Sequence, residues 1–150
     1  MAEPSQRFVK IELETRVEAL RSTVYRAITV ELGAWWPHRF RSDGEVYHEG
    51  RVGGTLGERW PDGGGVAYGT IMWLEPDTKQ VTSSIGVFGD YVATNTETLI
   101  DADGARIYRK SLHLWGDVPE EMVKMFREGS RQLMEQSLKA YCERVAEELK

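Results

Sequence analysis

The sequence has little of what a metal site or a disulfide framework requires. Its 150 residues include one cysteine, Cys142, and three histidines, His38, His48 and His113. A single cysteine excludes an internal disulfide and is typical of a reducing compartment, so we expect a cytoplasmic protein. No HExxH or CxxC pattern occurs and no two histidines have metal-ligand spacing, so we expect no metal.

Long apolar runs and an excess of basic charge are also lacking. No stretch approaches the ~20 apolar residues of a membrane-spanning helix, and the first ten residues lack the apolar core of a signal peptide. The formal net charge is −5, whereas a nucleic-acid partner favours a basic face. We therefore expect one domain over residues 1–150, with no nucleic-acid or membrane partner, as a monomer or a homodimer.

Motifs for phosphate binding and nucleophilic catalysis are lacking too. The run Gly63-Gly64-Gly65 continues into a strand pattern instead of the lysine and helix of a phosphate-binding loop. No Gly-x-Ser-x-Gly elbow occurs, and Cys142 lies beside an apolar helical stripe, where we expect a buried, inert thiol. Glu58 and Arg59 are interpreted as surface charges in salt bridges. Catalytic residues therefore stay unknown, and we expect no cofactor.

What the sequence does contain is a series of short strand patterns. Residues 8–17 alternate between apolar and charged, which predicts a half-buried antiparallel strand. Ser22 is then predicted to cap a short helix. The sequence Asp103-Gly104 between two strand-like runs is typical of a hairpin turn. Strands are predicted near 44–50, 54–60, 66–75, 79–88, 91–101 and 105–115.

The chain ends in a long amphipathic pattern. Asp117 and Glu120 have the spacing of a capping box, and the pattern predicts a helix over about 119–147. At 1.5 Å per residue such a helix is long enough to cross a whole sheet. Its predicted apolar stripe is Met122, Val123, Phe126, Leu133, Ser137, Tyr141 and Val145.

Several short segments, in this order, resemble a known superfamily. They are Val24 to Thr29, Trp35-Trp36-Pro37, Gly53-Gly54, Glu58-Arg59-Trp60, Gly65, Gly69, Glu75-Pro76 and Met125 to Ser130. The chain is similar to the START-like (SRPBCC) superfamily, and within it to the activators of the heat-shock-protein-90 ATPase and to polyketide cyclases. The resemblance implies an α+β helix-grip fold, in which a curved antiparallel sheet of six to seven strands surrounds a long C-terminal helix. It also implies two short helices after the first strand and a cavity between sheet and helix.

Such a cavity would hold a small hydrophobic or amphipathic molecule, which is the function that we expect. Ligand sites are mostly apolar with a few placed polar groups. The residues that the family order places around the cavity are Trp36, Trp60, Trp73, His113, Phe126 and Tyr141. Plain core packing is an equal alternative for the aromatic rings. For His113, an edge or core position bonded to the backbone is the favoured alternative.

Residues Gln80 to Ser84 are smaller and more polar than the family pattern. They either open room for a polar ligand group or mark an outer sheet face, and we favour the outer face because antiparallel sheets commonly show one face to water. Two other functions stay open. One is an enzyme of cyclase, dehydratase or hydrolase type that positions its substrate in the cavity. The other is an interaction module that regulates a chaperone, which rests on fold analogy alone.

Overall fold

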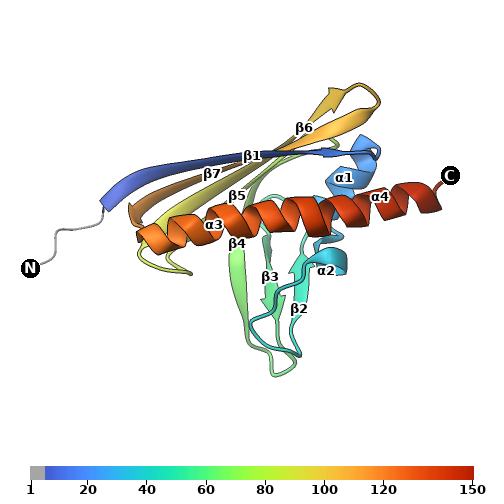
Figure 1. Cartoon of the computed structure of the whole chain (residues 1–150). Helices are drawn as coiled ribbons and strands as arrows, with labels where there is room; N and C mark the ends of the chain where they lie inside the picture. Colours follow the sequence, from blue (N-terminus) through green and yellow to red (C-terminus); the bar gives the residue numbers. More distant parts are fainter. Residues whose placement is uncertain (1–5) are drawn as a thin grey trace, which may run out of the picture.

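The computed structural model describes residues 6–150, and its elements follow the predicted order (Figure 1). Strand β1 (Gln6–Val17) leads into two short helices, α1 (Arg21–Ile28) and α2 (Leu32–Trp35). Six strands follow: β2 (Glu45–His48), β3 (Thr55–Arg59), β4 (Gly65–Glu75), β5 (Lys79–Ile85), β6 (Tyr91–Ala102) and β7 (Ala105–Asp117). The chain ends in one long helix of three contiguous segments: α3 (Glu120–Gln132), η1 (Leu133–Leu138) and α4 (Lys139–Glu148).

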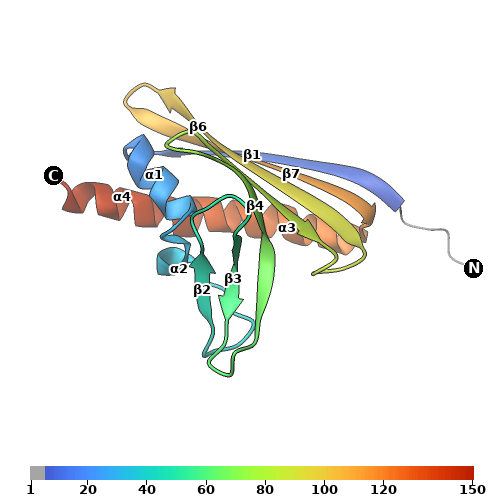
Figure 2. The same cartoon turned by 180° about the vertical axis from the view of Figure 1, so that it is seen from behind.

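The strands form one seven-stranded antiparallel sheet in the order β1-β7-β6-β5-β4-β3-β2. The sheet curves around the long helix, which crosses its inner face, while α1 and α2 support the C-terminal half of that helix (Figures 1 and 2). The predicted α+β helix-grip fold is therefore confirmed.

The hairpin between β6 and β7 shows how the local sequence sets this topology. Ala102 pairs with Ala105 across a two-residue turn, in which Asp103 has φ 42° and Gly104 has φ 80°. Two consecutive positive φ values fit the right-handed twist of the flanking strands, and aspartate and glycine are the residues that tolerate them. The predicted hairpin is confirmed.

The long helix begins differently from the prediction. Pro119 is its N-cap, and no side chain caps it. Glu120 instead pairs with the Arg7 guanidinium on β1 at 2.7 Å, and Nε of the same arginine donates to the Val118 oxygen at 2.8 Å. The predicted capping box is wrong because Glu120 is used to fasten the start of the helix to the edge strand.

The buried face of the helix is turned by one residue from the predicted stripe. Its buried residues are Val123, Ser130, Met134, Leu138 and Cys142. Phe126 and Tyr141 are partly buried against this core. The segment η1 is π-helical, with the wider turns that are rare in proteins and frequent at functional sites. A regular period of 3.6 does not describe such a segment, which is one reason why the stripe is shifted.

Candidate functional site

The inner face of the sheet carries a polar network beneath the long helix. The Gln80 amide on β5 is 1% exposed, and its Nε2 donates to the Ile28 backbone oxygen and to Oε1 of Glu97, both at 3.0 Å. Thr82, two residues further along β5, is also buried. The outer-face interpretation of this segment is therefore wrong for Gln80 and Thr82. Burial of the polar Gln80 side chain is tolerated because its amide forms hydrogen bonds with α1 and β6.

Glu97 on β6 is the centre of this network. Its Oε2 accepts a hydrogen bond from the Tyr108 hydroxyl, and its Oε1 accepts a second one from Nδ2 of Asn95 at 3.0 Å. Burial, followed by the charge of Glu97, raises the pKa of Tyr108 well above its usual value. The tyrosine is therefore a fixed donor, and the network joins β5, β6 and β7 across the inner face.

Two atoms on the inner face of β6 are buried without any partner in the described part of the chain: the Tyr91 hydroxyl oxygen and Asn95 Oδ1. Tyr91 is 6% exposed, and its ring packs edge-on against Phe126 of α3 with the ring centroids 6.1 Å apart. Ala93, which lies between Tyr91 and Asn95 on the same strand face, packs against the core. Buried polar atoms are nearly always paired, so these two require an explanation.

Glu58 on β3 is a second buried carboxylate, and it is covered by the loop that leads to β2. It is 1% exposed and accepts hydrogen bonds from the Phe40 and Arg41 backbone N–H groups at 2.8 and 3.0 Å. The Trp60 indole and the Tyr68 hydroxyl donate to it at 2.7 and 3.3 Å. The interpretation of Glu58 as a surface charge in a salt bridge is wrong, because these four donors replace the water that it loses.

Desolvation alone would raise the pKa of Glu58. The hydrogen bonds from Trp60, Phe40, Arg41 and Tyr68 outweigh it and lower the pKa below its usual value. A side chain at Gly44 would place its Cβ 2.3 Å from Glu58 Oε2, so the loop closes tightly on the carboxylate.

The same loop brings aromatic rings together at one end of the sheet. Phe40 stacks on Phe88 of the β5–β6 loop, with centroids 6.0 Å apart and planes 11° apart. Tyr68 on β4 contacts both of these rings and also Trp36. Burial, followed by the charge of Glu58, raises the pKa of Tyr68 to about 12. These rings join the loop after α2 to the β5–β6 loop.

The six residues predicted from the sequence do not form a single cluster, although Trp36 and Trp60 both contact the Tyr68–Glu58 pair. Phe126 meets Tyr91, and Trp36 meets Tyr68. Trp60 belongs to the Glu58 cluster, where the Arg41 guanidinium lies 5.0 Å from its ring. The remaining three are Trp73, His113 and Tyr141. Tyr141 shares a surface hollow with Trp35, whose ring contacts Trp36.

Trp73 and His113 lie on the outer face of the sheet. Trp73 is 49% exposed beside Lys79, because the register of β4 shifts between Ile71 and Trp73. His113 lies between the rings of Phe8 and Trp115. Outward positions do not face the helix, and their role in ligand binding stays a prediction.

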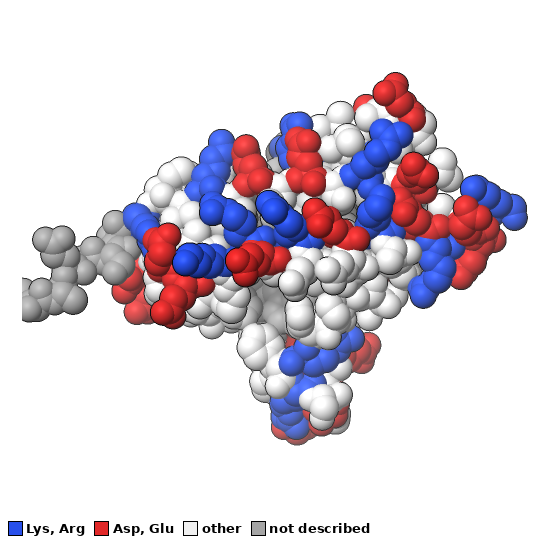
Figure 3. Space-filling model, in the orientation of Figure 1, with Lys and Arg blue, Asp and Glu red and all other residues white. Residues whose placement is uncertain are grey.

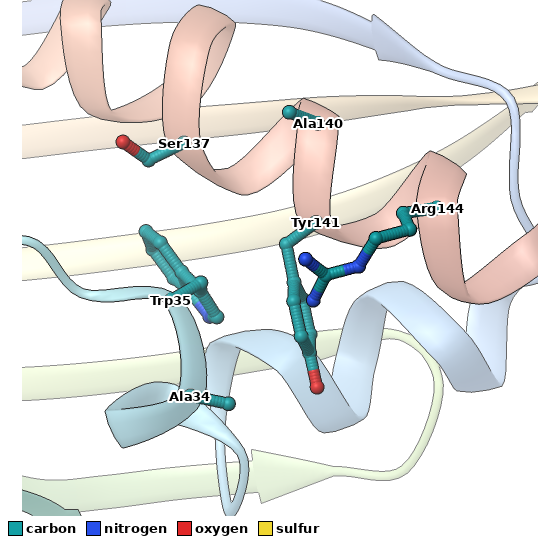
Figure 4. Close-up of a pocket in the computed structure, with 6 residues that line it drawn as sticks. All are labelled: Ala34, Trp35, Ser137, Ala140, Tyr141 and Arg144. Carbon is teal, nitrogen blue, oxygen red and sulfur yellow. The ribbon is translucent and has the colours of Figure 1, made fainter.

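Tyr141 lines a surface hollow of about 310 Å³ between α4 and α2, together with Trp35, Ser137 and Arg144 (Figure 4). Its hydroxyl donates to Oε1 of Glu31 at 2.6 Å, and burial, followed by this bond, raises the pKa of Tyr141 to about 12. The phenol thus ties the last helix to the loop before α2.

Sequence reasoning missed Tyr91 and Asn95. They belong to the alternating set Tyr91, Ala93, Asn95, Glu97 and Leu99, which faces the helix. Polar residues lie on both faces of this strand, so alternation alone could not tell which set was buried.

Within residues 6–150, no group of three or more metal-ligating side chains is found, and no helix is both long and apolar enough to span a membrane. Cys142 is buried, as predicted, and burial raises the pKa of its thiol to about 12. On the face that carries the long helix, basic and acidic side chains are interspersed (Figure 3).

A curved antiparallel sheet around a long C-terminal helix defines the helix-grip class, to which START-like proteins belong. No protein-family model matches the chain, and no curated protein sequence matches it. Solved structures do match its fold. The solution structure of the Aha1 dimer from Colwellia psychrerythraea is 20% identical over 90% of this chain and 96% of its own, with a TM-score of 0.66.

Two further structures extend this comparison. The crystal structure of Mll3558 from Rhizobium loti is 22% identical over 91% of this chain and 98% of its own, with a TM-score of 0.67. The crystal structure of Ara h 8.0201 is 14% identical over 93% of this chain and 98% of its own, with a TM-score of 0.63. At these identities the likeness is one of fold.

Proposed function

We propose that the protein binds a small amphipathic molecule between the inner face of β6 and the long helix. The observation that carries the proposal is the pair of buried, unpartnered atoms, the Tyr91 hydroxyl oxygen and Asn95 Oδ1. An unpaired buried polar atom costs about 1–3 kcal/mol, and a ligand that supplies its partner recovers that free energy. A few polar groups in an apolar setting are typical of ligand sites.

The surroundings of the two atoms support the same proposal. Leu112 and Leu114 lie beside Asn95 and Ala93 on β7 and give the site an apolar wall. The π-helical segment belongs to the helix that covers this face. Because both atoms are buried, the proposal requires Phe126 or the helix to move away from the sheet as a ligand enters.

Binding is tested with the neutral apolar probe N-phenyl-1-naphthylamine. We expect it to quench tryptophan fluorescence and to raise the melting temperature with probe concentration, because it binds the folded state alone. Native mass spectrometry of protein purified from its own host gives the second readout, a co-purifying small molecule. A melting temperature that stays constant up to saturating probe overturns the proposal.

The location is tested with a matched pair on neighbouring positions. Ala93→Phe places a ring on the inner face, whereas Thr94→Phe places the same ring on the outer face. We expect the first variant to lose probe binding and the second to keep it. Equal binding by two folded variants places the probe elsewhere.

A second candidate function is self-association through the outer face. Exposed apolar side chains form one cross-strand row from β5 to β1: Ile85, Val92, Trp115 and Phe8. An exposed apolar row of this kind is typical of an interaction surface. The occupant that we favour is a second copy of this chain, since a structural neighbour, Aha1, was solved as a dimer.

Sedimentation at several protein concentrations tests this candidate. We expect a dimer, and we expect Trp115→Glu to give a monomer because it places a charge in the apolar row. Thr98→Glu, on the same sheet face but beyond the row, is the matched control and should stay dimeric. A monomeric wild-type protein at all concentrations excludes the interface.

A further inference from the structure

The hydrogen-bond network on the inner face has only one consistent arrangement of donors and acceptors. At one end, the Gly50 backbone N–H donates to Nδ1 of His48 at 3.0 Å, so Nδ1 carries no proton. The ring proton is therefore on Nε2, which lies 2.5 Å from Oε1 of Gln80 and donates to it. Burial, the largest effect on this ring, lowers the pKa of His48, in agreement with the neutral form.

The amide of Gln80 is fixed from the other side as well. The Ile28 backbone oxygen can only accept, so the group that faces it must be the Gln80 amino group. That amino group also donates to Oε1 of Glu97. The two independent ends, His48 and Ile28, demand the same orientation of Gln80.

Glu97 then fixes Asn95. The carboxylate accepts from Gln80, from Tyr108 and from Asn95, and all three partners are donors at this point. Turning the Asn95 amide over would place its oxygen against a carboxylate oxygen. The amino group of Asn95 therefore faces Glu97, and Oδ1 points away, buried and without a partner.

From this arrangement we infer that the ligand's buried polar end is a hydrogen-bond donor, a hydroxyl or an amino N–H, which Asn95 Oδ1 accepts. The inference rests on the proposed function and names the chemical class of its ligand. The Tyr91 hydroxyl can rotate to donate or to accept, so it serves either kind of ligand. Asn95 is the residue that discriminates, because an ether, ester or carboxylate would place oxygen against oxygen.

Two neutral probes of the same size separate donor from acceptor without adding charge. 1-Octanol carries a hydroxyl, and heptyl methyl ether carries the same atoms with no O–H. Each is titrated against the wild-type protein in competition with N-phenyl-1-naphthylamine. We expect the alcohol to bind about tenfold more tightly, since it satisfies a buried acceptor that the ether leaves unpaired.

Asn95→Leu is nearly isosteric and removes the acceptor, so the preference for the alcohol should disappear while the ether binds as before. Thr96→Val, on the opposite face of β6, is the matched control and should keep the preference. If the Leu variant does not fold, the wild-type comparison decides alone.

The outcomes separate the inference from the proposed function. Equal binding of the two probes, or tighter binding of the ether, overturns the inference and leaves the proposed function standing. Failure of the alcohol, the ether and the naphthylamine probe to bind overturns the proposed function and the inference together.

Discussion

Glu58 illustrates how much a single buried side chain can organise. Its two carboxylate oxygens hold the loop before β2, the Trp60 indole and the Tyr68 phenol in one cluster. Neighbouring residues of a strand face opposite sides, and accordingly Glu58 is buried while Arg59 is exposed. The sequence does not predict which side is covered, because the covering loop is distant in sequence and its donors are backbone N–H groups.

At this scale we expect Glu58→Gln to lower the free energy of unfolding by about 3 kcal/mol. Each oxygen of Glu58 accepts from two donors, so the amino group of glutamine faces two N–H or O–H donors whichever way the amide turns. Urea unfolding measures the loss.

Glu12→Gln is the control for that substitution. Glu12 forms an exposed pair with Lys10, and its loss should change the stability by less than about 0.5 kcal/mol. Similar losses of stability for the two variants would show that the buried Glu58 carboxylate does not hold this loop and these side chains together.

The long helix supplies part of the hydrophobic core that covers the inner face of the sheet. Its position and length were predictable, because an amphipathic pattern of this length is hard to place elsewhere. Its exact buried face was not, since the π-helical segment re-aims the side chains between Leu133 and Leu138. Periodicity reports the average face of a helix and does not report a local widening of its turns.

We expect Leu138→Ala to cost about 3 kcal/mol of unfolding free energy, through lost burial and the cavity left behind. Leu138 is 1% exposed and lies at the end of the π-helical segment, whereas Leu149 is 68% exposed. Leu149→Ala, the same substitution outside the core, should cost less than about 0.5 kcal/mol. Chemical denaturation of both variants checks the difference, and an equal small effect would contradict the packing of the helix on the sheet.

For the whole molecule, the order of elements and the hairpin at Asp103-Gly104 could be predicted because local patterns specify them, and the resemblance to START-like proteins implied the helix-grip fold. The interior was harder to predict. The polar residues of β5 and β6 are buried because residues from four elements satisfy one another there, as His48, Gln80, Glu97 and Tyr108 do. No local sequence pattern predicts hydrogen bonds between side chains from four separate elements. The direction in which Trp73 and His113 point was equally hard to predict, and both lie on the outer face.

The interior network makes the stability of the whole molecule depend on pH. Burial lowers the pKa of His48 below its ordinary value of 6.5, and bonds to Gln80 and the charge of Glu97 only partly oppose this. As the pH falls through the ordinary value, the unfolded chain takes up the proton before the folded protein does. The stability that His48 contributes is therefore complete above that pH and is lost toward the lowered pKa.

We accordingly expect the wild-type protein to lose stability between about pH 7.5 and about pH 5.5, measured by urea unfolding at each pH. His48→Gln cannot take up a proton, and its amide can still donate to Gln80, so the variant should lose most of this dependence. His113→Gln, on the outer face, should retain it. If the His48 variant keeps the full dependence while the His113 variant loses it, the outer histidine is responsible, and the assignment of a neutral, buried His48 has no support.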